Sequence, residues 1–292
     1  MEDATVSKAK FIHNDFANIN SWLFVPATRI DRVAKAFASG ADAVIVDLED
    51  TVAVADKAQA RLEIQDYCYS TETSASHKAI WLRINQIGSS ESNKDLALCQ
   101  QLPNLAGIVL AKAEQAVDIE YVHHYTNLPV IALIETALGL SQVDSMAGAS
   151  GLLAFSYGFL DLCNDLNVQV STPAADNIAN QVRYQLLLSS KVQGLLAPID
   201  TIYPDFKDSK GLHDRVILWS QMGLSGMLCI HPKQVAVIQQ SLQPSAAELD
   251  FAKRVVAEYE RSYEAVFKID GNMVDAPVIE RCRQLLAKWP NI

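Results

Sequence analysis

The chain has 292 residues, of which 24 are Lys or Arg and 34 are Asp or Glu, so its formal net charge is −10. The sequence contains no basic run or basic stripe, which excludes the electrostatic footprint of a nucleic-acid-binding protein. No apolar stretch approaches the ~18 residues that a membrane-spanning helix needs, and we therefore expect no membrane partner.

The five cysteines are odd in number, far apart and without a C-x-x-C pair. They are Cys68, Cys99, Cys163, Cys229 and Cys282. This usage predicts buried, reduced thiols and a cytoplasmic location.

From residue 21 onward, short apolar runs alternate with amphipathic segments, after a polar lead-in at 1–20 that we expect to be flexible. The expected strands are Trp22–Pro26, Ala43–Leu48, Ile80–Asn85, Gly107–Leu110, Val130–Ile134, Leu152–Phe155, Leu195–Pro198 and Met227–Ile230. The expected helices are 30–39, 57–68, 96–102, 115–125, 140–146, 178–193, 210–222 and one starting at 232. Eight strands alternating with helices predict an α/β fold, a (β/α)8 TIM barrel over 21–243, with a doubly wound open sheet as the alternative.

Residues 244–292 are expected to form a C-terminal helical extension. Ser245 with Glu248 three positions later predicts a capping box at the start of a helix that runs to about Val266. A turn at 269–271 and a last helix ending near Trp289 follow. A barrel closes without such a tail, so we expect it to pack on a neighbouring subunit.

Polar residues follow most of the expected strands at their carboxyl ends. They are Asp47 and Glu49, Arg83 and Asn85, Lys112, Glu135, Asp200 and His231. In a barrel these ends converge on one face, where the active site lies. The acidic run 47–50 at this face indicates a metal, a cationic partner or acid–base chemistry.

Glu135 and Asp161 follow neighbouring strands, and two such carboxylates can hold one octahedral Mg²⁺. The alternatives are a helix N-terminal position for either residue, or an ion pair for Glu135. Arg83 is flanked by apolar residues and suits a carboxylate or enolate oxygen. Its alternative role is a structural salt bridge to Glu49 or Asp50.

The segment 21–61, SWLFVPATRIDRVAKAFASGADAVIVDLEDTVAVADKAQAR, resembles the opening of the citrate lyase β-subunit-like proteins of the HpcH/HpaI aldolase superfamily. The resemblance continues in order through LRIN, IVLAKAE, ALIETALGL, FLDLCNDL, LAPIDTIYPDF, GLSGMLCIHPKQV, PSAAELDFAKRVV and IDGNMVDAPVIERC. It covers about residues 20–288.

This resemblance implies a TIM barrel that assembles as a homotrimer or hexamer. It implies an Mg²⁺-dependent carbon–carbon lyase that cleaves a 3-hydroxyacyl-CoA thioester of the citryl-, citramalyl- or malyl-CoA type. The products would be an acyl-CoA and an oxo-acid, so small-molecule acyl-CoA and oxo-acid partners are implied.

The resemblance also assigns the metal and the chemistry to particular residues. Glu135 of IET and Asp161 of LDL match the metal ligands, and Arg83 of RIN matches a substrate contact. Asp275 of MVDAP matches an aspartate that reaches the active site of a neighbouring subunit. The acidic strand end, with Asp47 and the following Glu49 and Asp50, matches residues that organise the arginine and metal-bound water.

Three basic residues match substrate-binding positions: Arg29 and Lys35 for the CoA phosphates, and Lys112 beside the substrate. Two positions depart from the pattern, Ala111 where proline is usual and Phe159 where a small or polar residue is usual. Phe159 predicts a narrower substrate choice or lower activity.

Two other functions remain open from the sequence. One is a class II aldolase acting on free oxo-acids without CoA. The other is a non-catalytic homologue, which only Phe159 supports and which the joint presence of Arg83, Glu135, Asp161 and Asp275 opposes.

Overall fold

The protein is described by a computed structural model over residues 16, 18–70 and 79–289. Its chain divides into two compact units, with the boundary between Ser241 and Leu242. Most of the expected lead-in at 1–20 lies outside the described residues. The two units are described separately below.

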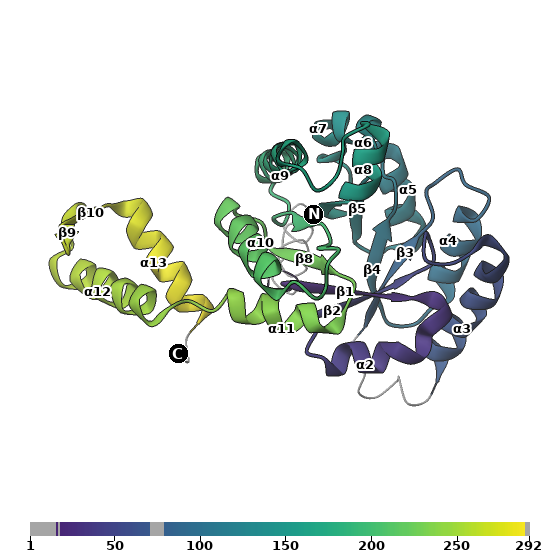
Figure 1. Ribbon diagram of the computed structural model, residues 1–292, viewed down its shortest axis with the longest axis horizontal. Coiled ribbons are helices and arrows are strands. Elements are labelled where there is room, and N and C mark those ends of the chain that lie inside the picture. Colours follow the sequence, from purple (N-terminus) through teal and green to yellow (C-terminus); the bar gives the residue numbers. More distant parts are fainter. Residues whose placement is uncertain (1–15, 17, 71–78, 290–292) are drawn as a thin grey trace, which may run out of the picture. The chain divides into compact units, whose positions relative to one another are not determined.

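The first unit is built on one sheet of eight parallel strands, which confirms the predicted α/β barrel (Figure 1). The strands are β1 (Ser21–Pro26), β2 (Ala43–Asp47), β3 (Ile80–Ile84), β4 (Leu105–Leu110), β5 (Val130–Ile134), β6 (Leu152–Tyr157), β7 (Ile199–Asp200) and β8 (Gly226–Cys229). Their order in the sheet is β6-β5-β4-β3-β2-β1-β8-β7. Runs of Val, Ile and Leu that are buried on both faces favour parallel strands covered by helices.

The sheet is nearly closed, because its two edge strands are the neighbours β6 and β7. The segment before β7 bridges them, since the backbone N–H of Leu196 donates to the carbonyl of Leu153 at 3.1 Å. We expected the seventh strand at Leu195–Pro198, but β7 begins only at Ile199. Pro198 has no N–H to give to a ladder, which explains the later and shorter strand.

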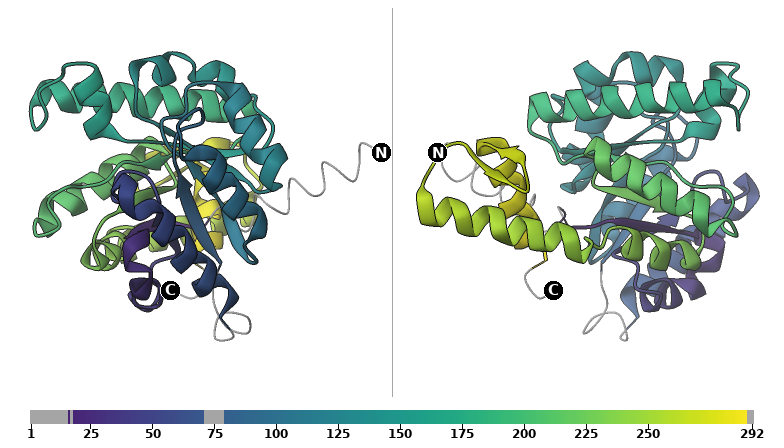
Figure 2. Two further views of the ribbon diagram at one scale, coloured as in Figure 1. Left: turned by 90° about the vertical axis from the view of Figure 1, so that its right-hand side faces the viewer. Right: turned by 60° about the vertical axis from the view of Figure 1, so that its left-hand side comes forward.

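Helices cover the outside of the strands (Figures 1 and 2). They are η1 (Ala27–Arg32), α2 (Val33–Ala38), η2 (Val54–Asp56), α3 (Lys57–Tyr69), α4 (Ser92–Gln101), α5 (Ala116–Thr126), α6 (Ala137–Ser141), α7 (Val143–Met146), α8 (Phe159–Asp165), α9 (Pro173–Gln193), α10 (Ser209–Met222) and α11 (Pro232–Ser241). The helix N-terminal position that was the alternative for Asp161 is confirmed, because Asp161 lies in the first turn of α8.

The barrel interior contains two large indole side chains, and one of them packs against a glycine on the neighbouring strand. Trp22 of β1 and Trp81 of β3 are almost fully buried and pack edge to face, with ring centroids 5.2 Å apart. A Cβ atom at Gly107 would lie 2.3 Å from the ring of Trp81. Glycine in β4 is therefore required by the width of the neighbouring indole.

The second unit is a pair of helices with a hairpin between them. They are α12 (Ala246–Ser262), β9 (Phe267–Ile269), β10 (Asn272–Val274) and α13 (Ala276–Lys288). The capping box of Ser245 and Glu248 is confirmed. The helix α12 ends four residues before the expected Val266, because Tyr263 adopts the left-handed conformation at φ 53°.

All five cysteines are buried and none forms a disulfide, which confirms the predicted reduced thiols. Among the described residues, no helix is both long enough and apolar enough to cross a bilayer. The cytoplasmic location and the packing of residues 244–292 on another subunit stay predictions.

Candidate active site

The strands β2 and β3 end in a buried ion pair. Asp47 lies opposite Arg83 in the parallel register. Nε and Nη2 of Arg83 donate to the two carboxylate oxygens of Asp47 at 2.6 and 2.7 Å. The expected ion pair of Arg83 with Glu49 is also present, with Nη1 of Arg83 3.4 Å from the Glu49 carboxylate, whereas Asp50 pairs with Lys112.

Asp47 also anchors the loop that follows β2. Its carboxylate accepts the backbone N–H of Glu49 at 2.9 Å and the hydroxyl of Thr51 at 2.6 Å. Burial by itself would raise the pKa of Asp47, but the hydrogen bonds and charge of Arg83 outweigh burial and lower the pKa. The ion pair therefore fixes both the charge of Arg83 and the path of the acidic loop.

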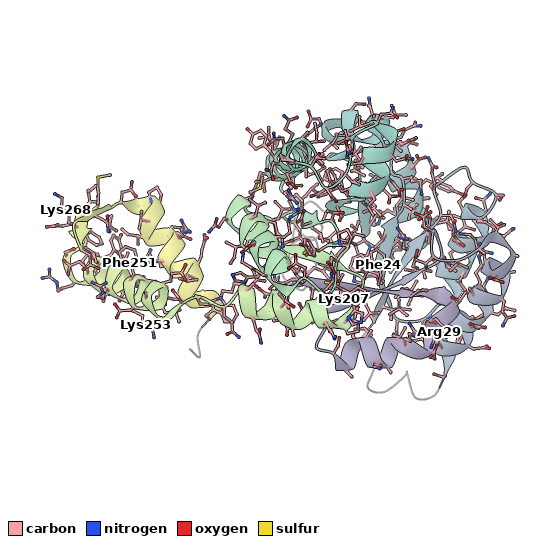
Figure 3. All side chains as sticks on the ribbon, in the orientation of Figure 1. Phe24, Arg29, Lys207, Phe251, Lys253 and Lys268 are labelled. Atoms are coloured by element: carbon pink, nitrogen blue, oxygen red, sulfur yellow. The ribbon has the colours of Figure 1, made fainter. Side chains whose placement is uncertain are left out.

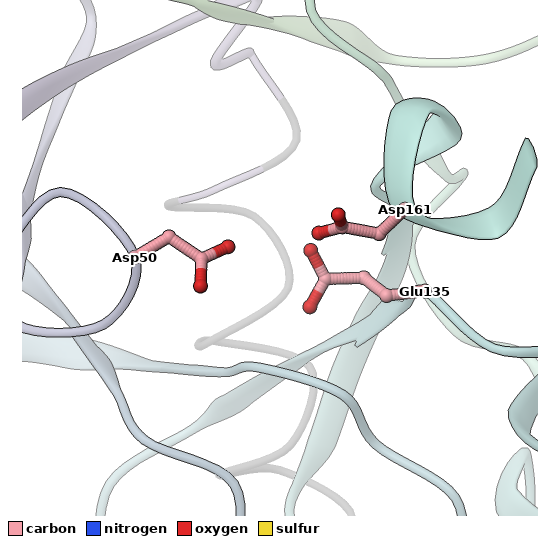
Figure 4. Close-up of side chains that lie close together, drawn as sticks. All are labelled: Asp50, Glu135 and Asp161. Atoms are coloured by element: carbon pink, nitrogen blue, oxygen red, sulfur yellow. The ribbon is translucent and has the colours of Figure 1, made fainter. Parts of the chain in front are cut away.

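Three carboxylates from different strand ends converge next to this pair. One oxygen each from Asp50, Glu135 and Asp161 can be chosen so that all lie within 4.8 Å of one another (Figure 4). Carboxylate oxygens in such a group are the ligands that Mg²⁺ prefers. The structure thus brings together the predicted pair Glu135 and Asp161, and it adds Asp50, which the resemblance matched to residues that organise the arginine and metal-bound water.

The position of Asp50 next to Glu135 depends on how the loop after β2 turns, which the sequence does not show. The hydrogen bonds of Asp47 hold that loop so that Asp50 projects beyond the buried pair toward Glu135. A signal existed in the sequence, since Asp50 is the last carboxylate of the acidic run and the one farthest from the strand.

Glu135 is the buried member of the group, with only 2 % of its surface exposed. Burial raises the pKa of Glu135 to about 7, against the lowering effect of the nearby Arg83. A buried carboxylate with a raised pKa gains from a cation placed next to it. The donor set and its electrostatics therefore fit a divalent metal ion.

Lys112 connects the acidic loop to Glu135. Its Nζ forms ion pairs with Glu49 and, at 3.4 Å, with Asp50. Its backbone N–H donates to Glu135 at 2.9 Å. Lys112 has the left-handed backbone conformation at φ 49°, which is uncommon for a residue with a side chain and is often found at functional sites.

Gly158, directly after β6, leaves room for Glu135. A Cβ atom on this glycine would lie 2.4 Å from Oε1 of Glu135. No real Cβ makes such a contact, so a larger residue at 158 would displace the carboxylate. Glycine is thus part of the site although it carries no functional group.

A buried lysine, Lys57, donates hydrogen bonds to the backbone of the acidic loop after β2. It was not predicted as a site residue. Nζ of Lys57 donates to the carbonyls of Leu48 and Glu49 at 2.6 and 2.8 Å and to Oδ1 of Asn85 at 2.7 Å. The side chain is 5 % exposed. Its signal in the sequence is weak, because a lysine at the start of a helix is usually solvated.

A second buried ion pair lies between β7 and α9. Asp200 accepts from Nε of Arg183 at 2.8 Å and from the hydroxyl of Tyr157 at 2.5 Å. All three side chains are at most 1 % exposed. Asp200, predicted as a polar strand end, thus serves to join the edge strands of the barrel.

A cavity of about 280 Å³ lies next to the carboxylate group. Its described lining residues come from the carboxyl ends of β2, β3, β5, β6, β7 and β8 and from Phe24 of β1. Arg83, Asp50, Glu135 and Asp161 all line it. This is the face at which barrel enzymes bind substrates.

The other predicted site residues lie elsewhere. Arg29 in η1 is exposed and pairs with Asp31, and Figure 3 shows it apart from the cavity residue Phe24. Lys35 is exposed on α2. Asp275 belongs to the second unit, where its side chain caps α13 by accepting the N–H of Val278. Arg29 and Lys35 are therefore not part of the cavity lining, and the roles of all three residues stay predictions.

The fold and the site together define an enzyme of the (β/α)8 class with a carboxylate group suited to a divalent metal. The profile of the HpcH/HpaI aldolase/citrate lyase family matches residues 20–232, and the chain belongs to that family.

Similar proteins agree with this placement. The chain is 34% identical over 275 residues to the "Citrate lyase subunit beta-like protein" of Mycobacterium tuberculosis, covering 91% of this chain and 94% of that protein. It is 32% identical over 279 residues to a "(3S)-malyl-CoA thioesterase" of Cereibacter sphaeroides, covering 92% and 93%.

A solved structure matches over nearly the whole chain. It is protein CitE of Mycobacterium tuberculosis in complex with magnesium, acetoacetate and coenzyme A. The TM-score is 0.82 at 32% identity, covering 93% of this chain and 98% of that one. The same protein is also known with magnesium and pyruvate.

Proposed function

We propose that the chain is an Mg²⁺-dependent carbon–carbon lyase acting on a 3-hydroxyacyl-CoA thioester. It would release an acyl-CoA and a 2-oxo acid. The observation that carries this proposal is the group of Asp50, Glu135 and Asp161 beside the fixed cation Arg83 in one cavity. The magnesium and CoA complexes of the CitE relative support it.

Asp50, Glu135 and Asp161 would hold the magnesium ion. When bound, the ion would supply a Lewis acid for the carboxylate and hydroxyl oxygens of the oxo-acid half of the substrate. Asp50 and Asp161 are accessible to solvent, while Glu135 is buried. Glu135 is therefore fixed by the surrounding protein, while Asp50 and Asp161 face the side from which substrate can enter.

Arg83 would stabilise the negative charge that appears on the thioester half. When the carbon–carbon bond breaks, its electron pair passes to the acyl half as an enolate. A guanidinium that is already ordered by Asp47 meets this charge without reorganising, and Arg83 lines the cavity.

Asp275 is our candidate for the proton transfer at the enolate carbon. The hydroxyl of the substrate loses one proton and the enolate carbon gains one, so the two transfers cancel. We propose that Asp275 acts at the cavity of another copy of the chain, as the family resemblance implies. Arg29 and Lys35 are our candidates for the CoA phosphates, because both are exposed and cationic.

Hydrolysis of the thioester is the second candidate, because a relative at 32% identity is named a malyl-CoA thioesterase. The two reactions give different products. A lyase releases an oxo-acid and keeps the thioester bond, whereas a thioesterase releases a free thiol and a hydroxy acid.

The test is incubation of the protein and Mg²⁺ with citryl-, citramalyl- and malyl-CoA. Oxo-acid is trapped as a hydrazone and free thiol is titrated in parallel samples. We expect oxo-acid and acyl-CoA in equal amounts, with no free thiol. Thiol without oxo-acid would replace the lyase by a thioesterase, and no product from any of the three would refute both.

A further inference from the structure

The backbone of the acidic loop after β2 (residues 48–51) is held by one buried ammonium group. Lys57, at the start of α3, binds the carbonyl oxygens of Leu48 and Glu49 and the side-chain oxygen of Asn85. These three acceptors use all three N–H groups of the ammonium. All three are uncharged oxygens, so the ammonium gives the loop a positive charge that no directly bonded carboxylate cancels.

Asn85, which directly follows β3, holds Lys57 in place. Its amide nitrogen donates to Oδ2 of Asp95 at 2.6 Å, and its backbone N–H donates to the same oxygen at 3.0 Å. An ammonium only donates and a carboxylate only accepts, so these two neighbours fix the orientation of the Asn85 amide. Lys57 is therefore connected through Asn85 to α4, which carries Asp95.

A second cation of α3 completes this connection. Nε of Arg61 donates to Oδ1 of Asp95 at 2.8 Å, and its Nη2 donates to Glu91 at 2.6 Å. The five side chains of this network, Lys57, Arg61, Asn85, Glu91 and Asp95, are at most 9 % exposed. A buried polar network whose members are all paired holds them in one arrangement. The acidic loop is thus fastened to α3 and α4.

The same loop carries Asp50 of the metal group. Asp50 directly follows the Glu49 carbonyl that Lys57 binds, and it lies opposite Glu135 and Asp161 (Figure 4). Like charges repel one another, so the carboxylates of the metal group push the exposed Asp50 away before a cation binds. The ammonium of Lys57 opposes this movement, because it holds the backbone next to Asp50 and adds a positive charge there.

We propose that Lys57 is a positioning residue for the metal group. It keeps Asp50 within reach of Glu135 and Asp161 in the metal-free protein, so that a divalent ion meets ligands that are already in place. Asn85 positions Lys57 in turn. This inference rests on the proposed function for the identity of the ion, and it names what prepares the site for that ion.

The first test compares magnesium binding by two variants that each lose three hydrogen bonds at an end of β2. Lys57→Met removes three bonds at the carboxyl end. Asp42→Ala is the matched control at the amino end, because Oδ2 of Asp42 accepts from the backbone N–H groups of Asn20 and Ser21 and from the Ser21 hydroxyl. Calorimetric titration should show about tenfold weaker binding by Lys57→Met and wild-type affinity in Asp42→Ala. Wild-type affinity in Lys57→Met, or an equal loss in both variants, overturns the inference.

A double-mutant cycle shows whether Lys57 acts through Asp50. Asp50→Asn alone removes one ligand charge and should weaken magnesium binding. Adding Lys57→Met should then weaken binding by less than about threefold further, because no carboxylate is left at position 50 to be positioned. Lys57→Met should lower the free energy of unfolding equally in both backgrounds, so loss of stability alone does not produce this result. A further loss of more than about threefold in magnesium affinity would overturn the inference.

Hydrogen exchange tests the positioning without a metal. The backbone N–H groups of Glu49 and Thr51 donate to the carboxylate of Asp47. In the metal-free protein Lys57→Met should speed the exchange of these two amides about tenfold or more, because their protection depends on local opening of the loop. Asp42→Ala should leave both rates unchanged. Wild-type exchange rates in Lys57→Met would overturn the inference.

Asn85→Ala takes the place of Lys57→Met where that variant does not fold. It removes the oxygen that orients Lys57 and keeps the two bonds of Lys57 to the loop, so it disturbs the loop less. We expect about threefold weaker magnesium binding by Asn85→Ala. Magnesium affinity equal to that of the wild type would count against the positioning and overturn it.

The thioester assay separates this inference from the proposed function. Thioester cleavage by the wild type, together with wild-type magnesium affinity in Lys57→Met, would support the lyase and overturn the inference. The expected loss of affinity in Lys57→Met, with no cleavage by the wild type, would support the inference and refute the lyase. No magnesium binding by the wild type would overturn the inference.

Discussion

At the scale of single residues, the site depends on groups that order one another before any ligand arrives. Asp47 fixes Arg83 through two short hydrogen bonds, and it also fixes the loop that carries Asp50. A preorganised cation costs little to align when charge develops. The ion pair of Asp47 and Arg83 therefore contributes to the stability of the fold and also prepares Arg83 for its proposed role in the reaction.

The pH dependence of stability follows from the lowered pKa of Asp47. A carboxyl whose folded pKa lies below its unfolded value stabilises the fold above the unfolded pKa of about 4. The contribution is lost as the pH falls toward the lowered folded pKa. Asp47→Asn should cost about 3 kcal/mol at pH 7, since it leaves Arg83 buried without its counter-charge.

Urea unfolding of the wild type and Asp47→Asn over a pH series measures this directly. The difference between the two proteins should be constant above about pH 5 and should shrink by about 1 kcal/mol or more by pH 3. A difference of the same size at pH 3 and pH 7 would show that the ion pair does not lower the pKa of Asp47.

Gly158→Ala tests the crowding around Glu135. The new Cβ would meet Oε1 of Glu135 at 2.4 Å, so the carboxylate must move. We expect magnesium affinity to fall about tenfold or more. Gly148→Ala is the control, because its Cβ would meet nothing within 4 Å and its effect should be negligible. Equal magnesium affinities in the two variants would contradict the crowding.

At the scale of secondary-structure elements, a hydrogen bond connects the two edge strands of the barrel, β6 and β7, and a buried ion pair connects β7 to α9. The strand β7 has only two residues, and Asp200 at its end is tied to Arg183 of α9 and to Tyr157 of β6. This network replaces ladder hydrogen bonds that so short a strand cannot make. The cavity residue Thr201 follows directly on Asp200.

Arg183→Met should therefore destabilise the protein strongly. It leaves Asp200 buried without a cation, and breaking such a pair costs about 3–5 kcal/mol. Lys210→Met removes an exposed pair to Asp214 on α10, and water screens such a pair, so this variant should leave the free energy of unfolding almost unchanged. Chemical denaturation of both variants gives the comparison, and a similar small loss in both would mean that the edge does not depend on this network.

Most of the elements were predictable from periodicity, while several boundaries were not. The runs Val130–Ile134 and Ala43–Asp47 are apolar and bounded by polar residues, so local pattern was enough. The strand β7 starts after Pro198, because proline has no N–H for the sheet. The helix α12 ends at Ser262, because Tyr263 has a left-handed backbone conformation. Such features depend on hydrogen bonds and packing that no single window of sequence contains.

At the scale of the whole molecule, the face of the barrel that carries the site was predictable because strand ends converge. Glu135 and Asp161 were expected together and lie together. The binding of Arg83 by both carboxylate oxygens of Asp47 and the place of Asp50 were not predictable, because they depend on the register of β2 against β3 and on the turn after β2. Lys57 was missed because its burial is a property of the fold.

The contribution of a second copy of the chain can be tested by complementation. Glu135→Gln and Asp275→Asn should each be inactive alone, for different reasons. If Asp275 acts in another copy, co-expressed oligomers of the two variants should recover about a quarter of the wild-type activity per site. Half of the barrels keep Glu135 and half of the neighbouring tails keep Asp275. No recovery in mixed oligomers would place Asp275 in its own chain's site or outside catalysis.

The most direct test of the central claim is a calorimetric titration of the metal-free protein with Mg²⁺. The wild type should bind one ion per chain, and Glu135→Gln should weaken binding about tenfold or more. Glu114→Gln is the matched control, because Glu114 accepts a hydrogen bond from Thr136 at 2.7 Å without belonging to the carboxylate group. It should bind magnesium as the wild type does. Magnesium binding by Glu135→Gln with the affinity of the wild type would contradict the account.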